Sequence, residues 1–287
     1  MKDMLDWAKF YTSKGFSVIP IKPQTKEPSI KWKKYQQSKP SPEELEQWFK
    51  GKNPKEVGIA VVLGISNFIA IDIDKPEVWP LFFDETSEEL AEKTWVSKTS
   101  KGFHVFFRYR GKSESIELRG VVELKAKGRY VVVPPSIHPT GDVYQWLTNI
   151  EEVDVDWIKA DKYRQIEKTI ELLRKYWNLI EILLDLWREG VRHDEALAIA
   201  GLLRKARIPK RDALWIIEAV AKIKDDEELK DRLRAVEDTY KKPLNEIAGV
   251  SKLREILKPR LGEEKTEEVI ARIKEAIGSE RASKLEE

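Results

Sequence analysis

The stretch Ile69-Ala70-Ile71-Asp72-Ile73-Asp74 decides the fold of the first half of this 287-residue chain. Its apolar residues predict a buried strand, and the strand ends in two carboxylates. Residues two apart on a strand face the same side of a sheet, so Asp72 and Asp74 project together. Two negative charges this close repel each other unless a cation is present. The stretch therefore predicts either a strand that presents Mg²⁺ to a triphosphate or a strand end with two solvated acids.

Short β-branched or aromatic runs, several of them bounded by glycine, lie on both sides of this stretch and predict the other strands of a central sheet. They cover residues 16–21, 58–63, 67–73, 104–109, 121–124, 129–133 and 144–147. Amphipathic helices are expected at 4–14 and 41–50. In the second helix, Ser41 is the expected N-cap, Pro42 occupies the first position and Glu44 completes a capping box. Residues 1–160 therefore predict a domain of mixed α and β structure.

The pattern changes in the second half, where apolar residues are spaced three and four apart, as is typical of helices. One long helix is expected to carry Ile166, Ile170, Leu173, Trp177, Ile180 and Leu184 on one face and to end at Gly190. Shorter helices are expected at 194–206, 210–222, 227–240, 252–257 and 264–277, with Pro209, Pro243 and Pro259 between them. The predicted fold class is α+β, with a first domain at 1–160 and an all-α helix bundle at 165–287.

Composition restricts the chemistry. The chain has no cysteine and only three histidines, which excludes disulfides and cysteine-bound zinc and predicts that carboxylates hold any metal, favouring Mg²⁺ or Mn²⁺. Charged residues reach 36%, which is typical of a thermophile or of strongly solvated helices. The net charge is only +2, so any basic surface must be local. Neither a signal peptide nor a membrane-spanning stretch is recognisable, and a cytoplasmic protein is expected.

Six further residues are candidates for the same chemistry. Ser100 and Lys101 lie in a short polar turn that can offer N–H groups and a cation to phosphate. His104, at the start of the next strand, is interpreted either as a phosphate ligand or as a structural histidine. Glu123 is either a third metal carboxylate or an ordinary exposed acid, with Lys125 on the same face of its strand. His138 follows a turn with two prolines and either lines a pocket or stabilises a corner.

In this order, the segments resemble the bifunctional primase-polymerase domain of archaeal plasmid and phage replication proteins, within the archaeo-eukaryotic primase superfamily. The similarity covers roughly residues 5–150. It is carried by Gly15-Phe16-Ser17-Val18-Ile19-Pro20 with Lys26 and Pro28, by Val57-Gly58-Ile59, Asp72-Ile73-Asp74 and Thr99 to His104, and by Glu123, Gly128-Arg129-Tyr130 and Pro134-Pro135-Ser136. The sequence departs from the family's common pattern in having Glu123 in place of aspartate, Lys125 in place of arginine and a single glycine before His104.

The resemblance implies a mixed-sheet catalytic domain with a two-metal mechanism. Asp72, Asp74 and Glu123 are then the metal ligands and catalytic residues, binding two Mg²⁺ or Mn²⁺ ions that activate a primer 3′-hydroxyl and neutralise the triphosphate. The implied nucleotide-binding residues are Ser100, Lys101, His104, Lys125 and His138. The implied partners are a single-stranded DNA template and dNTP or NTP, and the implied activity is that of a DNA primase and polymerase in plasmid or viral replication.

The helical half resembles, more weakly and over about residues 165–245, the helix bundle that follows the catalytic domain in plasmid primases. This resemblance implies template binding and help with primer initiation, and the alternative is a plain helical bundle. Basic residues there predict either a DNA contact or an ordinary solvated surface. They are Arg192, Arg204, Lys205, Arg207, Lys210 and Arg211.

Two other functions stay open on the sequence alone. One is a non-catalytic replication-origin or single-strand DNA-binding protein, in which the acidic cluster is incidental. The other is a metal-dependent nuclease, which the triphosphate-binding segment Ser100 to His104 disfavours. The sequence contains no phosphate-binding loop of the helicase type. We therefore expect either a fragment of a longer primase-helicase or a protein that works with a separate helicase.

Overall fold

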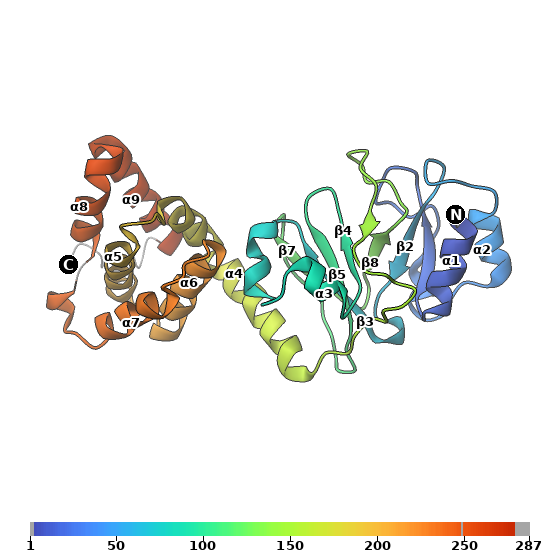
Figure 1. Cartoon of the computed structure of the whole chain (residues 1–287), viewed down its shortest axis with the longest axis horizontal. Coiled ribbons are helices and arrows are strands. Elements are labelled where there is room, and N and C mark those ends of the chain that lie inside the picture. The colour runs from blue at the N-terminus through green and yellow to red at the C-terminus, as the bar shows by residue number, and fades with distance from the viewer. Residues whose placement is uncertain (1–2, 248, 279–287) are drawn as a thin grey trace. The chain divides into compact units, whose positions relative to one another are not determined.

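This computed structural model describes residues 3–247 and 249–278. The chain forms two compact units that divide between Glu171 and Leu172. The first unit contains all the named strands and the second is helical, which confirms the α+β class. The division falls inside the long helix α4 (Ala160–Leu186; Figure 1).

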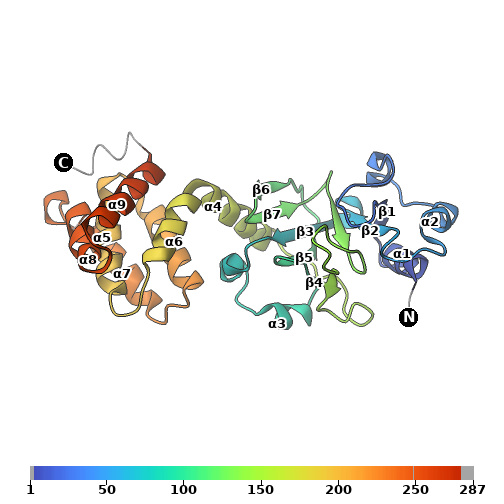
Figure 2. The same cartoon turned by 90° about the horizontal axis from the view of Figure 1, so that it is seen from above.

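The first unit contains two antiparallel sheets. The smaller has the order β1 (Ser17–Ile21), β2 (Gly58–Val62) and β8 (Tyr130–Val133). The larger has the order β6-β7-β3-β5-β4-β9, and Figure 2 shows its first five strands in this sequence. Their bounds are β3 Phe68–Ile73, β4 Val96–Lys98, β5 Phe103–Arg108, β6 Ile116–Leu118, β7 Val122–Lys125 and β9 Gln145–Trp146.

The sheets differ from the single mixed sheet that was expected, because every pairing between named strands is antiparallel. The predicted strands are present with small shifts at their ends, but β4 and β6 were not predicted. Each has only three residues, and β6 has no buried position, so neither leaves an apolar pattern in the sequence. Parallel pairing needs long crossover connections, whereas the paired strands β4 and β5 are joined by the short turn at residues 99–102, and β6 and β7 by residues 119–121.

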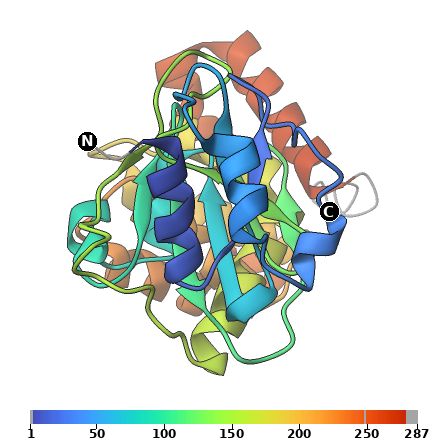
Figure 3. The ribbon, with the colours of Figure 1, turned by 90° about the vertical axis from the view of Figure 1, so that its right-hand side faces the viewer.

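Two helices of the first unit cover the smaller sheet. Figure 3 shows α1 (Met4–Ser13) and α2 (Pro42–Phe49) side by side in front of it. The capping box predicted for α2 is present, since Ser41 Oγ accepts from the Glu44 N–H and Glu44 accepts from the Ser41 N–H. The short helices are η1 (Lys33–Gln36), η2 (Ile65–Asn67), η3 (Pro76–Leu81) and α3 (Ser87–Ala91), and α3 was not predicted.

A buried aromatic core holds this unit together. The ring of Phe16 stacks on Phe68 at 3.6 Å between centroids, and Phe10 stacks on Trp95 at 6.1 Å. All six residues of β3 are buried, so this strand packs on both faces. A carboxylate on β3 is therefore held in a rigid, largely apolar setting, which fixes its position but makes its charge costly.

The second unit consists of α5 (Arg192–Lys205), α6 (Lys210–Ile223), α7 (Leu229–Thr239), η4 (Leu244–Glu246), α8 (Val250–Leu261), α9 (Glu263–Ile277) and the end of α4. The prediction of one long helix over 166–184 is confirmed by α4, but the helix ends at Leu186 rather than at Gly190. Pro259 was expected between helices but lies inside α8. It stands in the last turn, where the missing N–H removes one hydrogen bond just before the chain turns at Gly262, whose φ is +79°.

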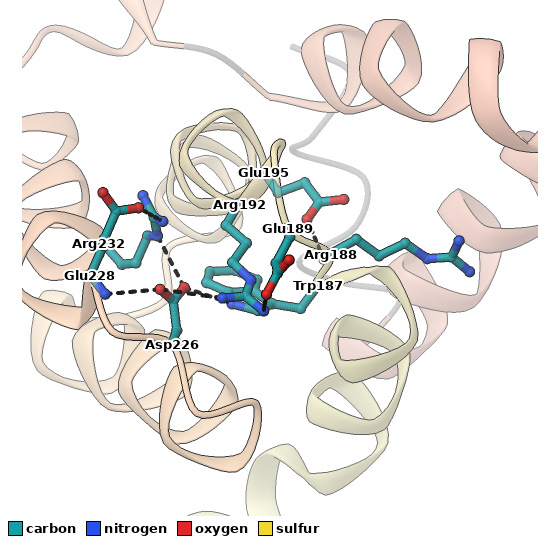
Figure 4. Close-up of polar contacts among 8 residues, drawn as sticks. All are labelled: Trp187, Arg188, Glu189, Arg192, Glu195, Asp226, Glu228 and Arg232. Carbon is teal, nitrogen blue, oxygen red and sulfur yellow. Dashed lines mark hydrogen bonds and ion pairs between the residues drawn. The ribbon is translucent and has the colours of Figure 1, made fainter.

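A buried ion network joins the end of α4, α5 and α7 (Figure 4). Asp226 accepts hydrogen bonds from Arg232 Nε at 3.1 Å and from Trp187 Nε1 at 3.0 Å. Arg192 approaches the same carboxylate at 3.7 Å. Nearby, Glu195 on α5 accepts from Arg260 Nη1 at 2.8 Å. We call Asp226, Arg232, Trp187 and Arg192 the helical ion network.

No helix in the described part of the chain is long and apolar enough to cross a membrane.

Candidate active site

The candidate site is a row of polar side chains across three neighbouring strands of the larger sheet. Asp72 on β3 lies directly opposite His104 on β5 and directly opposite Glu123 on β7. Residues opposite each other in antiparallel strands project on the same face. The pairing register thus brings together three residues that are up to 51 positions apart (from Asp72 to Glu123).

Two cations complete the row. Lys125 Nζ lies 2.7 Å from Asp72 Oδ2 and 3.4 Å from Glu123 Oε2. Arg129 Nε lies 3.4 Å from Glu123 Oε1. His104 Nε2 lies 3.4 Å from Asp72 Oδ1. Lys125 therefore bridges the two carboxylates, and each of them has a second basic neighbour on its outer side.

Burial and charge oppose each other at Asp72. Burial disfavours its charged form, but His104 and Lys125 outweigh that cost, so the pKa of Asp72 lies well below its usual range. The same balance acts on Lys125, where burial lowers the pKa while Asp72 and Glu123 raise it, and the net direction is upward. At neutral pH, Asp72 is a carboxylate and Lys125 is an ammonium group.

The row lines a pocket of about 230 Å³. Its wall contains Asp72, His104, Glu123 and Lys125, and also the aromatic residues Trp32, Tyr130 and Tyr144 and the cations Lys26 and Arg129. Trp32 meets Tyr130 edge to face, with 5.0 Å between ring centroids. The pocket thus combines acidic, basic and aromatic groups, which is the set that a nucleotide's metal ions, phosphates and base require.

One polar atom in this row is buried without a partner. His104 Nδ1 makes no hydrogen bond within the described residues. The His104 ring stacks on Tyr144 at 5.8 Å. Burial raises the pKa of Tyr144, and the charges of Asp72 and Asp74 add to this effect, so its hydroxyl stays protonated. An unpaired buried polar atom is costly, and His104 Nδ1 therefore has an unused capacity for one hydrogen bond.

Asp74 lies two residues beyond Asp72, just after β3, where its N–H donates to the Val121 carbonyl at 2.9 Å. It is half-buried and does not belong to the residues that line the pocket. As the side chains are placed, no three histidine, aspartate or glutamate residues in the described ranges form a cluster able to hold a metal ion. The donors nevertheless fit a hard divalent cation in kind, since Asp72 and Glu123 are adjacent carboxylates on one face.

The predicted phosphate-binding turn lies beside the end of β3. A Cβ on Gly102 would come within 1.8 Å of the Ile73 carbonyl oxygen, so this close approach requires glycine. Thr99 Oγ1 accepts from the N–H groups of Lys101 and Gly102 at 3.2 and 2.9 Å. The glycine that the sequence retains before His104 therefore has a structural reason.

Ser100 and His138 contact each other rather than the pocket. Ser100 Oγ lies 3.0 Å from His138 Nδ1, and Thr140 Oγ1 lies 2.8 Å from the same nitrogen. Burial and the nearby Lys26 lower the pKa of His138. Lys101 is exposed on the same turn. The structure thus places His104 and Lys125 in the pocket and the other three predicted nucleotide-binding residues beside it.

The basic residues of the helical unit fall into two groups. Arg192 takes part in the helical ion network, and Arg204 donates to the Thr239 carbonyl and lies over the Tyr240 ring. Lys205 is half-buried. Arg207, Lys210 and Arg211 are exposed, and Arg211 also pairs with Asp212 at 3.2 Å.

The sequence prediction did not assign seven of the pocket residues, and five of these are basic or aromatic, namely Lys26, Trp32, Arg129, Tyr130 and Tyr144. Lys26, Arg129 and Tyr130 lie within the motifs that carried the family resemblance, so a signal for them was present. Trp32 and Tyr144 had no such signal, because only the packing of the loop after β1 and of the segment before β9 brings them to the pocket.

A comparison with protein families gives one match. The family described as bifunctional DNA primase/polymerase, N-terminal, matches residues 8–157. The match covers 150 of the 287 residues and includes the whole of the pocket. A search of curated proteins gave no match.

Proposed function

Because this chain belongs to the bifunctional DNA primase/polymerase family, we propose that it copies a DNA template by transferring nucleotides from (d)NTP to a 3′-hydroxyl. The cofactor would be Mg²⁺ or Mn²⁺, and the protein would act in plasmid or viral replication in a thermophile. We also propose that the protein is cytoplasmic and that it works with a separate helicase.

One observation carries the catalytic part of the proposal. Asp72 is a buried carboxylate directly opposite both Glu123 and His104, and all three line one pocket. A structural acid of this kind is normally enclosed by its partners. Asp72 instead borders a pocket, with an unpartnered histidine nitrogen on one side and a second carboxylate on the other. Such grouping of perturbed titratable residues in a pocket is typical of active sites.

Each residue is given a role in this chemistry. Asp72, Asp74 and Glu123 would hold the divalent ions, which when bound activate the 3′-hydroxyl and stabilise the charge of the triphosphate. His104 donates from the pocket wall to a phosphate oxygen. Lys125 neutralises the carboxylates and turns toward a phosphate when a cation takes over that task. Ser100, Lys101 and His138 hold the turn that borders the triphosphate. The transfer needs no protein nucleophile.

The helical unit is proposed to bind the single-stranded template and to help initiate the primer. The exposure of Arg207, Lys210 and Arg211 supports this role, because exposed cations are available to phosphates. The other three basic residues, Arg192, Arg204 and Lys205, are half-buried and are not proposed to contact DNA directly. They stabilise the helices that carry the exposed residues.

The alternative of a non-catalytic DNA-binding protein predicts that the pocket carboxylates can be changed without consequence. We therefore propose a test that measures incorporation of labelled dNTP on a primed template with Mg²⁺ or Mn²⁺. Asp72→Asn should lower the rate by about a thousandfold or more, because it removes electrostatic stabilisation of the transition state. Asp84→Asn changes an exposed acid outside the pocket, and it should leave the rate unchanged.

Asp72→Asn also removes a partner of the buried Lys125, so loss of folding must be separated from loss of chemistry. Glu123→Gln is the second variant, since Lys125 keeps its 2.7 Å contact with Asp72 there. Normal extension by both folded variants would rule out the enzyme. Cleavage of DNA without dNTP-dependent extension would indicate a nuclease instead.

A further inference from the structure

The row of polar side chains continues across the larger sheet beyond the catalytic pocket. Ser97 on β4 lies directly opposite His104 on β5, which in turn lies directly opposite Asp72 on β3. Residues opposite each other in antiparallel strands project on the same face. The strand order β3-β5-β4 therefore places Asp72 and Ser97 on either side of His104 in the sheet. Ser97 does not belong to the residues that line the pocket.

Two atoms of this row are buried without a hydrogen-bond partner among the described residues. They are Ser97 Oγ and His104 Nδ1. Ser97 is 0% exposed and His104 is 4% exposed. A buried hydroxyl or ring nitrogen that makes no hydrogen bond is costly, and most such groups are paired. Because these two belong to residues that face each other across neighbouring strands, they are suited to pair with each other.

The direction of the His104 ring favours this pairing. Its Nε2 lies 3.4 Å from Asp72 Oδ1, on the β3 side. The hydrogen-bonding directions of the two imidazole nitrogens diverge, so Nδ1 points away from Asp72. The strand on that other side of β5 is β4, which carries Ser97.

The other neighbours of the ring leave Nδ1 to Ser97. Tyr144 is stacked on the face of the His104 ring, with the two planes inclined by 26°, whereas ring nitrogens form hydrogen bonds in the ring plane. Trp146, opposite Ser97 on β9, already donates from its Nε1 to the Tyr11 hydroxyl at 2.9 Å. Of the two residues opposite His104 in the adjacent strands, one is a carboxylate, so Ser97 is the one with a donor to offer.

The neighbours of His104 also determine which of its nitrogens carries the proton. A neutral imidazole has one N–H and one acceptor nitrogen. The Asp72 carboxylate only accepts hydrogen bonds, so the nitrogen that faces it must be the protonated one. Nδ1 is then the acceptor and needs a donor, which a serine hydroxyl supplies. The hydrogen bond at one ring nitrogen thus fixes the state of the other.

Resting on the proposed function, we propose that Ser97 is a positioning residue for His104. By rotating about its Cα–Cβ bond to another staggered position, Ser97 donates its hydroxyl hydrogen to His104 Nδ1 and holds the ring with its proton on Nε2. The Cβ atoms of directly opposite residues are about 4.5–5.5 Å apart, which brings the two groups within reach. His104 then presents its N–H to Asp72 and to a phosphate oxygen that enters the pocket. Ser97 itself touches no substrate.

The direct test reads the position of the proton from the ¹⁵N chemical shifts of the His104 ring, at alkaline pH where ordinary imidazole is neutral. The chain has three histidines, and the signals missing from His104→Gln identify His104. The parent should show a protonated Nε2 and a hydrogen-bonded Nδ1. Ser97→Ala should move the Nδ1 signal toward that of an unbonded nitrogen and populate the second tautomer. Unchanged ring signals in Ser97→Ala would overturn the inference.

Two further variants separate a hydrogen bond from packing. Ser17→Ala is the matched control, because it removes another fully buried strand hydroxyl, which donates to the Ser38 carbonyl at 3.3 Å. It should leave the His104 signals as they are in the parent. Ser97→Thr retains a hydroxyl and should keep both the parent tautomer and the hydrogen-bonded Nδ1. If Ser97→Ala does not fold, the parent spectrum decides, since a proton on Nδ1 overturns the inference.

The kinetics of primer extension connect this contact to the proposed chemistry. Ser97→Ala should raise the KM for the incoming dNTP by about tenfold, with a smaller change in kcat, because the His104 donor is no longer fixed toward the phosphate. Ser97→Thr and Ser17→Ala should keep the KM of the parent. An unchanged KM in Ser97→Ala would also overturn the inference.

The spectra require neither nucleotide nor DNA nor metal ion, so this inference and the proposed function can fail separately. Ring signals that depend on Ser97, in a protein that never extends a primer, would refute the catalysis and leave the contact between Ser97 and His104 standing. Normal extension by a protein whose His104 signals do not respond to Ser97→Ala would refute the positioning role alone.

Discussion

Two buried aspartates, one in each unit, show how differently the same side chain can be enclosed. Asp226 in the helical unit has a side chain that is 1% exposed, and it accepts hydrogen bonds from Arg232, Trp187 and the Glu228 N–H. Asp72 in the catalytic unit is 11% exposed at its side chain and has one short contact, to Lys125 at 2.7 Å. Its histidine neighbour lies at 3.4 Å and keeps an unpartnered nitrogen.

The difference is the one expected between a structural carboxylate and the metal-binding carboxylate that we propose. In both places a cation offsets the cost of burying the charge, and both pKa values lie below the usual range. At Asp226 the planar guanidinium of Arg232, the Trp187 indole N–H and the Glu228 N–H all donate to the carboxylate. At Asp72 the partner is a flexible lysine that another cation can replace, and the carboxylate faces a pocket. A lowered pKa alone would not have distinguished them.

The largest effect that we expect in this comparison is on stability, from Asp226→Asn. The substitution leaves Arg232 buried without its charge partner, so the free energy of unfolding of the helical unit should fall by about 3–5 kcal/mol. Denaturant titration followed by helical circular dichroism measures it. Asp185→Asn, an exposed acid on α4, is the matched control and should change little. Equal stability of Asp226→Asn and the parent would show that the network contributes nothing.

The contacts of Asp226 also determine how the free energy of unfolding changes with pH. Burial disfavours ionised Asp226, but Arg232 and its other donors outweigh this cost, so its pKa is lower when folded than when unfolded. Its stabilisation is present above the ordinary value of about 3.9 and is lost as the pH falls through the folded value. Glu195 acts in the opposite direction, because burial raises its pKa despite Arg260. Glu195→Gln should therefore steepen the loss of stability in acid.

A smaller effect on stability should come from divalent ions that bind at Asp72. Binding to the folded state alone raises the free energy of unfolding by about 2.7 kcal/mol when the ion is at a hundred times its dissociation constant. Thermal melting with and without Mn²⁺ detects this, and a chelator should reverse it. The shift should disappear in Asp72→Asn but persist in Asp226→Asn. A shift that survives Asp72→Asn would place the ion elsewhere.

The smallest effect should come from the exposed cations of the helical unit. Arg207→Ala and Lys210→Ala each remove one available charge, and each should flatten the salt dependence of single-stranded DNA binding by about 0.7. Arg204→Ala serves as the contrast, because this side chain bonds to Thr239 and should lower the melting temperature instead. Unchanged salt slopes in both exposed variants would contradict template binding by this surface.

The sequence predicted the elements of both units well, because their apolar patterns are local. The capping box at Ser41, the strand at Asp72 and the long helix over 166–184 all follow from residues a few positions apart. It could not predict that the strands divide into two antiparallel sheets, since pairing depends on contacts between distant segments. The three-residue strands β4 and β6 were not predicted because they are too short to leave an apolar pattern.

For the candidate site, the sequence predicted which residue types matter but not how they meet. The register that sets Glu123 and His104 opposite Asp72 is a property of the assembled sheet. Trp32 and Tyr144 reach the pocket only through loop packing, and Arg192 and Arg204 are drawn into contacts within the bundle. A basic or aromatic residue in a sequence does not reveal which of these environments it will occupy.

The close approach of Gly102 to the Ile73 carbonyl has a consequence for how this protein tolerates change. Any side chain at position 102 would push the 99–102 segment away from β3, which leads to Asp72 and Asp74. The distance between this segment and the two carboxylates is therefore fixed. Trp32 and Tyr130 also line the pocket but lie outside this close approach, so replacing either ring would change the pocket wall and leave that spacing as it is.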